Sequence, residues 1–182
     1  MDDNKQLWGK NTPWPTESSY FTYLRGCLRR AWNNNPIKIQ VIRENRKQIA
    51  NPNPKGKKPT VWGATCSICH NDFVLKDIQV DHINPAGKLQ KIEDIQGFVE
   101  RLLCIIKDDL RLVCKECNSL LAYSDKMGIP LEEAVIEKEA IKIIKERQDK
   151  QFFIDRGLDI PSNSIKRRQD IVTILKEENI NK

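Results

Sequence analysis

No part of the sequence looks like a membrane span or a signal peptide. The longest apolar runs are only a few residues, whereas a membrane-spanning helix needs about 20. The first residues, Met1 to Lys5, are polar and charged, unlike the basic and then apolar start of a secretory leader. These absences predict a soluble protein of the cytoplasm that has no membrane partner.

Histidine is scarce, and internal repeats are absent. The 182 residues include two histidines, and one of them, His82, follows Asp81 in V-D-H-I-N-P (residues 80–85). The length fits one domain of usual size with appendages, or two very small domains. An Asp-His pair before a turn is common, so the surrounding sequence must decide whether this pair has a function.

Four of the six cysteines form two Cys-x-x-Cys pairs. Cys66 and Cys69 make the first pair, and Cys114 and Cys117 follow after 44 intervening residues. In a cytoplasmic protein such spacing favours metal over disulfides. Zinc binds four thiolates in a closed tetrahedron that leaves no position for water, so we predict a structural Zn²⁺ site. Two redox pairs are the alternative, but neither pair has a thioredoxin-like strand–helix setting.

Positive charge is concentrated in the first third of the chain. Residues 1–60 carry 12 Lys/Arg against 4 Asp/Glu, whereas residues 61–128 have a net charge of −2 and residues 129–182 a net charge of zero. A basic arm of this kind suits a protein that binds a polyanion such as DNA, although a solvated basic surface would look the same. The predicted phosphate contacts are Arg25, Arg29, Arg30, Lys55, Lys57 and Lys58.

Hydrophobic periodicity and turn residues predict a mixed α and β chain. Helices are expected over 17–33, 37–49, 92–106, from near Cys117, over 130–148 and after Pro161, capped by Ser162 or Ser164. Strands are expected before Cys66, over 74–82 and over 109–113, with residues 51–59 as a linker. Cys27 and Cys104 lie on predicted helices and should be small core residues. The predicted parts are a basic helical arm and linker (1–60), a central core (61–128) and a C-terminal helical extension (129–182).

The two cysteine pairs bracket a set of polar residues. Asp81 and His82 end a predicted strand between the pairs, and Asn118 follows the second pair at the start of a helix. A shared zinc ion would hold that helix against that strand and bring the three side chains together. Carboxylate and amide oxygens suit Mg²⁺, and a neutral histidine beside the cation can deprotonate a water molecule.

Three segments resemble the HNH, or ββα-metal, nucleases. They are C-S-I-C (66–69), I-Q-V-D-H-I-N-P (78–85) and D-L-R-L-V-C-K-E-C-N (109–118). In that family zinc pairs and catalytic positions interleave in this order, and the resemblance covers about residues 61–125. The segments W-P-T-E-S-S-Y-F-T-Y-L-R (14–25) and S-N-S-I-K-R-R (162–168) are similar to those of phage-encoded HNH endonucleases, which implies an infected bacterial cell as the location.

The resemblance implies an α+β fold: a small zinc-stapled ββα-metal nuclease core with N- and C-terminal helical extensions. It also implies that His82 is the general base and that Asp81 and Asn118 ligate a catalytic Mg²⁺ or Mn²⁺. The family usually has an asparagine five residues before the third cysteine, where it orients the histidine and its loop. Here that position is Asp109, which accepts the same hydrogen bonds but cannot donate the amide ones.

The sequence therefore predicts a metal-dependent DNA endonuclease that nicks DNA or cuts both strands. One alternative is a phage Holliday-junction resolvase of the endonuclease VII type, which would act as an obligate homodimer. Another is a non-catalytic zinc-stabilised module that binds DNA or a phage protein partner. The cysteines suit all three functions, whereas Asp81, His82 and Asn118 have no use in the last.

Overall fold

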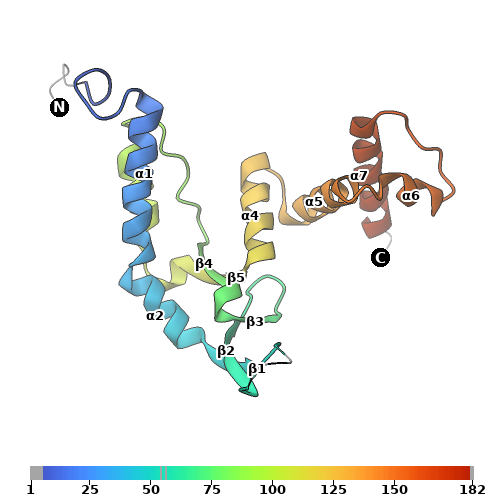
Figure 1. Cartoon of the computed structure of the whole chain (residues 1–182), viewed down its shortest axis with the longest axis horizontal. Helices are drawn as coiled ribbons and strands as arrows, with labels where there is room; N and C mark the ends of the chain where they lie inside the picture. The colour runs from blue at the N-terminus through green and yellow to red at the C-terminus, as the bar shows by residue number, and fades with distance from the viewer. Residues whose placement is uncertain (1–5, 54, 56, 181–182) are drawn as a thin grey trace. The chain divides into compact units, whose positions relative to one another are not determined.

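The computed structural model describes residues 6–180 except residues 54 and 56 (Figure 1). The chain is a mixed α and β protein that divides into two compact units, one ending at Lys115 and the other beginning at Glu116. Among the described residues, no helix combines the length and the apolar character needed to cross a membrane.

The first unit begins with two helices. α1 spans Glu17–Asn33, as predicted, and Thr16 and Ser19 form a capping box at its start. Asn35 caps α2 (Pro36–Asn45), because its side-chain oxygen accepts from the backbone N–H of Ile37 at 2.9 Å. The predicted helix over 37–49 was therefore too long. Its last residues instead form strand β1 (Lys47–Ala50).

β1 belongs to a three-stranded antiparallel sheet. β2 (Thr60–Thr65) lies between β1 and β3 (Asp72–Val74). The predicted linker, residues 51–59, joins β1 to β2 as the loop of a β-hairpin, and the N–H of Asn51 donates to the carbonyl of Pro59 across its base. Lys55, Lys57 and Lys58 lie exposed in this loop, and we call them the hairpin lysines.

A second, two-stranded antiparallel sheet carries the Asp81-His82 pair. β4 (Ile78–His82) pairs with β5 (Leu110–Cys114), and α3 (Asp94–Leu103) lies in the connection between them. Short 3₁₀ turns precede both strands, η1 (Leu75–Asp77) and η2 (Lys107–Asp109). α4 (Lys115–Met127) follows β5 directly. The predicted strand end at His82 is confirmed, and the helix predicted over 92–106 is shorter.

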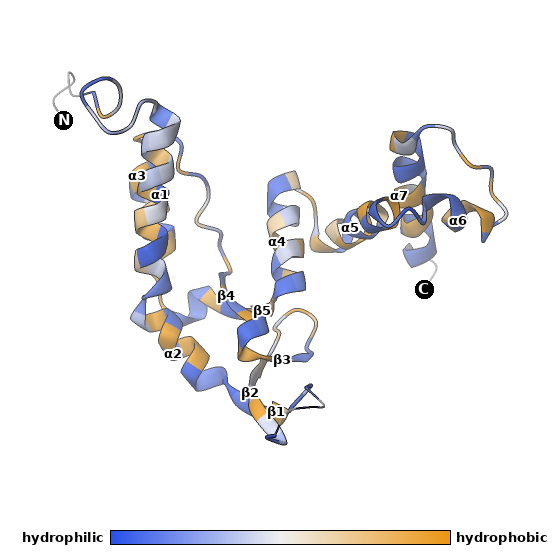
Figure 2. Ribbon diagram, in the orientation of Figure 1, coloured by the Kyte–Doolittle hydropathy of each residue, from blue (hydrophilic) through white to orange (hydrophobic). Residues whose placement is uncertain are grey.

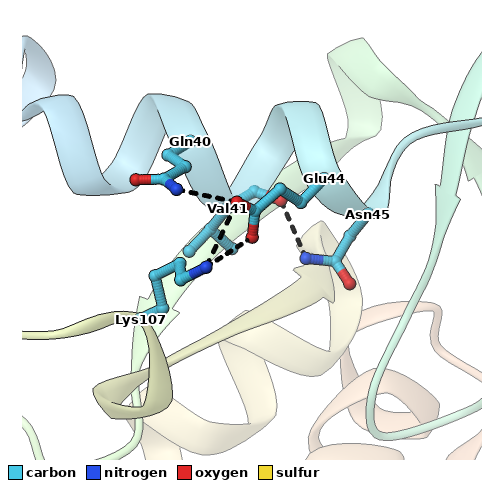
Figure 3. Close-up of polar contacts among 5 residues, drawn as sticks. All are labelled: Gln40, Val41, Glu44, Asn45 and Lys107. Carbon is cyan, nitrogen blue, oxygen red and sulfur yellow. Dashed lines mark hydrogen bonds and ion pairs between the residues drawn. The ribbon is translucent and has the colours of Figure 1, made fainter.

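Two hydrophobic clusters hold the first unit together. One joins α1 to α3 through Phe21, Phe98 and Leu102, with the fully buried Leu89 of the connecting loop, and apolar residues recur along both helices in Figure 2. The other packs α2 on both sheets. Figure 3 shows an ion pair next to this second cluster. Lys107 of η2 donates to both carboxylate oxygens of Glu44 on α2, at 3.1 and 2.9 Å. This contact holds η2, which leads directly into β5, against α2.

The second unit is helical. After α4 come α5 (Leu131–Lys145), α6 (Asp149–Ile154) and α7 (Ser164–Ile180), whose apolar residues form one core. The helix predicted to reach residue 148 stops earlier, because Arg147 adopts a φ of 58°. The cap of α7 is neither Ser162 nor Ser164 but Asn163, whose side chain accepts from the N–H of Ile165 at 2.8 Å.

Candidate active site and metal centre

The four paired cysteines gather into one cluster. Cys66 and Cys69 lie in the turn after β2, Cys114 is the last residue of β5, and Cys117 is in the first turn of α4. Their sulfur atoms all lie within 4.8 Å of one another, and all but Cys69 are buried. The other two cysteines lie elsewhere. The prediction that they are core residues was wrong, because Cys104 is exposed and Cys27 is only half-buried.

The chemistry of the cluster suits a metal ion. Burial raises the pKa of the Cys66 thiol, but backbone hydrogen bonds at Cys69, Cys114 and Ile68 and the Cys69 side chain outweigh burial and lower the pKa to about 6. The thiolate is the form that ligates a metal. The turn is closed by the N–H of His70, which donates to the carbonyl of Cys66 at 3.0 Å. The cluster could therefore hold an ion that prefers four sulfur ligands.

His82 stands at the end of β4 on the wall of a cavity of about 240 Å³. Its ring is half-buried against Trp32 of α1, with 4.3 Å between the ring centroids. Nε2 lies 3.2 Å from the carbonyl oxygen of Leu102 on α3. A carbonyl can only accept a hydrogen bond, so Nε2 carries the proton and Nδ1 is the basic nitrogen. The two contacts thus fix the position of the ring, and the Leu102 carbonyl selects its tautomer.

Asp109 lies on the wall of the same cavity and organises the backbone around it. Its carboxylate accepts from the N–H of Ile106 at 2.8 Å, and its own carbonyl accepts from the N–H of Ile83 at 2.9 Å. These bonds tie the turn before β5 to the residue after His82. An aspartate serves here because its side chain needs only to accept, and the bond from Ile83 goes to the backbone carbonyl, which any residue would supply.

Asp81 faces the other side of the sheet. Adjacent strand residues point to opposite faces, and Asp81 pairs across the strands with Arg111 while His82 pairs with Leu110. The Arg111 guanidinium donates to the Asp81 carboxylate at 2.9 Å, and both side chains are largely buried. Asn118 follows Cys117 in the first turn of α4. The structure thus gathers His82 and Asp109 at one cavity and gives Asp81 a cationic partner.

The predicted phosphate contacts differ in their surroundings. Arg25 is half-buried, and its guanidinium donates to the carbonyl of Leu89 at 2.6 Å, which ties α1 to the loop before α3. Arg30 donates to the sulfur of Cys27 at 3.1 Å. Arg29 and the hairpin lysines are exposed. Among the described residues, the side chains of these four exposed cations form no hydrogen bond or ion pair.

Four residues around Asp81 and His82 were not predicted from the sequence: Trp32, Arg101, Leu102 and Arg111. Arg111 was detectable, because a charged residue opposite Asp81 follows once the strands are paired in register. Trp32 and the Leu102 carbonyl had no such signal.

Comparisons with protein-family models, with curated proteins and with solved structures returned no match.

Proposed function

We propose that this protein is a metal-dependent endonuclease of the HNH type, which hydrolyses phosphodiester bonds of DNA. The observation that carries the proposal is the setting of His82. A histidine that only fills a core has both ring nitrogens satisfied inside the protein. His82 instead uses Nε2 for the Leu102 carbonyl and lines an open cavity, at the end of a strand pair that leads directly into a helix.

The cysteine cluster would hold Zn²⁺ as a structural ion. Four thiolates complete its preferred tetrahedron, so no position is left for water or substrate. Zinc would fix the turn after β2, the end of β5 and the start of α4 to one another. Its role is to keep the strand pair that carries His82 in register.

Hydrolysis would begin at Nδ1 of His82. This nitrogen accepts a proton from a water molecule, whose oxygen then attacks the phosphorus atom while the bond to the 3′ oxygen breaks. Asp81 and Asn118 are the proposed ligands of Mg²⁺ or Mn²⁺, which when bound stabilises the charge on the leaving oxygen. Because the Asp81 carboxylate lies on the face opposite His82 and contacts Arg111, it would have to release Arg111 and turn toward the end of β4 to bind this cation.

Binding of DNA would rest on charge rather than on base recognition. Arg29 and the hairpin lysines are exposed cations of the first unit, and phosphate contacts of this kind hold any duplex. One histidine site cuts one strand, so a double-strand break would need a homodimer or two encounters. The resemblance of residues 14–25 and 162–168 to phage-encoded HNH endonucleases supports the cytoplasm of an infected bacterium as the proposed location.

The test compares nicking of supercoiled plasmid by His82→Ala, Asp81→Ala and Asn118→Ala over a range of Mg²⁺ concentrations. His82→Ala should be slower by about 10²–10⁴ at every concentration, because general-base assistance is worth that factor. The two ligand variants should regain activity as Mg²⁺ is raised.

His70→Asn is the matched control. It removes the other imidazole, which is exposed and has a φ of 56°, a conformation that asparagine tolerates. This variant should nick like the parent. A His82→Ala protein that is folded and fully active would overturn the proposal, as would a parent protein that nicks no DNA with Mg²⁺ or Mn²⁺. The second result would leave the zinc-stabilised binding module as the better explanation.

A further inference from the structure

The wall of the His82 cavity carries a cation that the predicted site did not include. Arg101, in the last turn of α3, lines this cavity together with His82 and Asp109. Its Nε donates to the carbonyl of Ala86 at 3.1 Å, which orients the guanidinium toward the loop after β4. Within the described part of the chain, Arg101 forms no ion pair with a carboxylate. Its charge nevertheless acts on the carboxylate of Asp94, whose pKa is lowered mainly by backbone hydrogen bonds and in part by the charge of Arg101.

Two glycines allow the guanidinium to lie where it does. A Cβ atom at Gly97 would be 3.1 Å from Nη1 of Arg101, and one at Gly87 would be 3.3 Å from Nη2. Both distances are tighter than ordinary van der Waals contact. Gly87 also has a φ of +82°, which favours glycine. The backbone at Gly87 and Gly97 thus leaves room for the guanidinium group of Arg101.

The charges on the wall explain why a phosphate would need this residue. Glu100 and Asp109 also line the cavity, so the wall without Arg101 would be acidic and would repel a phosphodiester. Glu100 accepts from Gln96 at 2.9 Å and Asp109 from Ile106 at 2.8 Å, and because both donors are neutral the negative charges remain. Arg101 supplies a planar fork that matches two phosphate oxygens at once.

We infer that Arg101 forms a phosphate subsite of the His82 cavity, which holds the phosphodiester beside Nδ1 of His82. This inference rests on the proposed nuclease function and identifies the residue that places the substrate. Arg101 would contact a non-bridging oxygen of the phosphate under attack or of its neighbour. It takes up no proton and forms no covalent bond.

The experiment measures plasmid nicking by the full chain, with its metals, for Arg101→Ala, Arg101→Lys and Lys88→Ala. Lys88 is the matched control, because it is an exposed cation on the loop before α3 and is not part of the cavity wall. Arg101→Ala should lower kcat/KM by about 10²-fold, the scale seen when a preorganised charge-stabilising donor is lost. Lys88→Ala should stay within error of the parent. Arg101→Lys keeps the charge but loses the fork, so it should fall between the two.

Binding of a fluorescein-labelled duplex, with Ca²⁺ replacing Mg²⁺, gives a second measurement. The slope of log affinity against log salt should flatten by about 0.9 in Arg101→Ala and not in Lys88→Ala. An active parent whose Arg101→Ala variant keeps the parent's kcat/KM and slope would overturn the phosphate subsite and leave the nuclease proposal intact. An inactive parent would overturn both. If Arg101→Ala does not fold, Arg101→Lys decides: kcat/KM equal to the parent would overturn the inference.

Discussion

Replacing Cys114 by serine should unfold the region around the candidate active site rather than only slow the reaction. Cys114 is 2% exposed and ends β5, where it pairs with Ile78 at the start of β4. Two other members of the cluster, Cys66 and Cys117, are 0% and 5% exposed. A serine would put a hydroxyl in the buried position of a soft thiolate, and zinc would be left with three of its four ligands.

The expected loss is large compared with the stability of a small domain. Apparent binding of structural zinc is worth about 10–16 kcal/mol in small peptides, and a buried hydroxyl without a partner costs about 1–3 kcal/mol more. A typical domain unfolds with about 5–15 kcal/mol. Losing even half of the zinc contribution would therefore remove most of the stability of the unit that contains β4 and β5.

The assay combines metal content, measured by atomic emission, with urea unfolding followed by circular dichroism. Cys104→Ser is the control, because it makes the same chemical change at an exposed cysteine and should shift stability by less than about 0.5 kcal/mol. The reasoning would be refuted by a Cys114→Ser protein that contains no zinc, unfolds at the parent's urea midpoint and still nicks DNA.

Further variants and a change of pH test other parts of the structure. Replacing the hairpin lysines by glutamine should flatten the salt dependence of duplex binding by about 0.9 per lysine, and an unchanged slope would mean that they are only solvated. Asp149→Ala should cost about 3 kcal/mol in urea unfolding, because the largely buried Arg167, which donates to Asp149 at 2.5 Å, would lose its carboxylate partner and keep only the carbonyls of Pro161 and Ser162. The hydrogen bond from Arg167 lowers the pKa of Asp149. The contribution of the Asp149–Arg167 pair to the free energy of unfolding should therefore be complete above about pH 4 and be lost as the pH falls further. Equal urea midpoints of the parent protein at pH 7 and pH 3 would contradict this expectation. Gly63→Ala should destabilise the protein by about 1–3 kcal/mol, since the added Cβ would lie 2.5 Å from the carbonyl oxygen of Phe73. Gly26→Ala should instead stabilise α1 by about 0.5–1 kcal/mol, because the nearest atom to its added Cβ would be 3.8 Å away.

The elements that the sequence predicted well are those with local boundaries. α1 has a capping threonine at its start and Asn33-Asn34-Asn35-Pro36 at its end, so both limits follow from nearby residues. Residues 47–50 have no such signal, because the apolar spacing of α2 continues into them without a breaker. They become a strand by pairing with Thr60–Gly63, and pairing across a loop is not encoded in the periodicity of either segment.

The candidate site was predictable to the extent that it depends on spacing. Two Cys-x-x-Cys turns predict a cluster whatever the intervening fold, and the four sulfur atoms do come together. The partners of His82 could not be found in this way. Trp32 lies 50 positions before it, and Leu102 contributes a backbone carbonyl, which any residue type would supply.

The Leu102 contact nevertheless has a physical reason that links the fold to the proposed chemistry. The last four carbonyls of a helix lack intrahelical partners, and Leu102 is the second-last residue of α3. Its side chain is 5% exposed in the core shared with α1, so the position of this open carbonyl is fixed by packing. His82 satisfies the carbonyl through Nε2, and the carbonyl in turn holds Nδ1 as the basic nitrogen. The C-terminus of a helix also favours a neighbouring positive charge, which His82 would acquire on taking a proton from water. One turn of α3 thus supplies the acceptor that orients the proposed base, and Arg101 beside it supplies the proposed phosphate-binding cation.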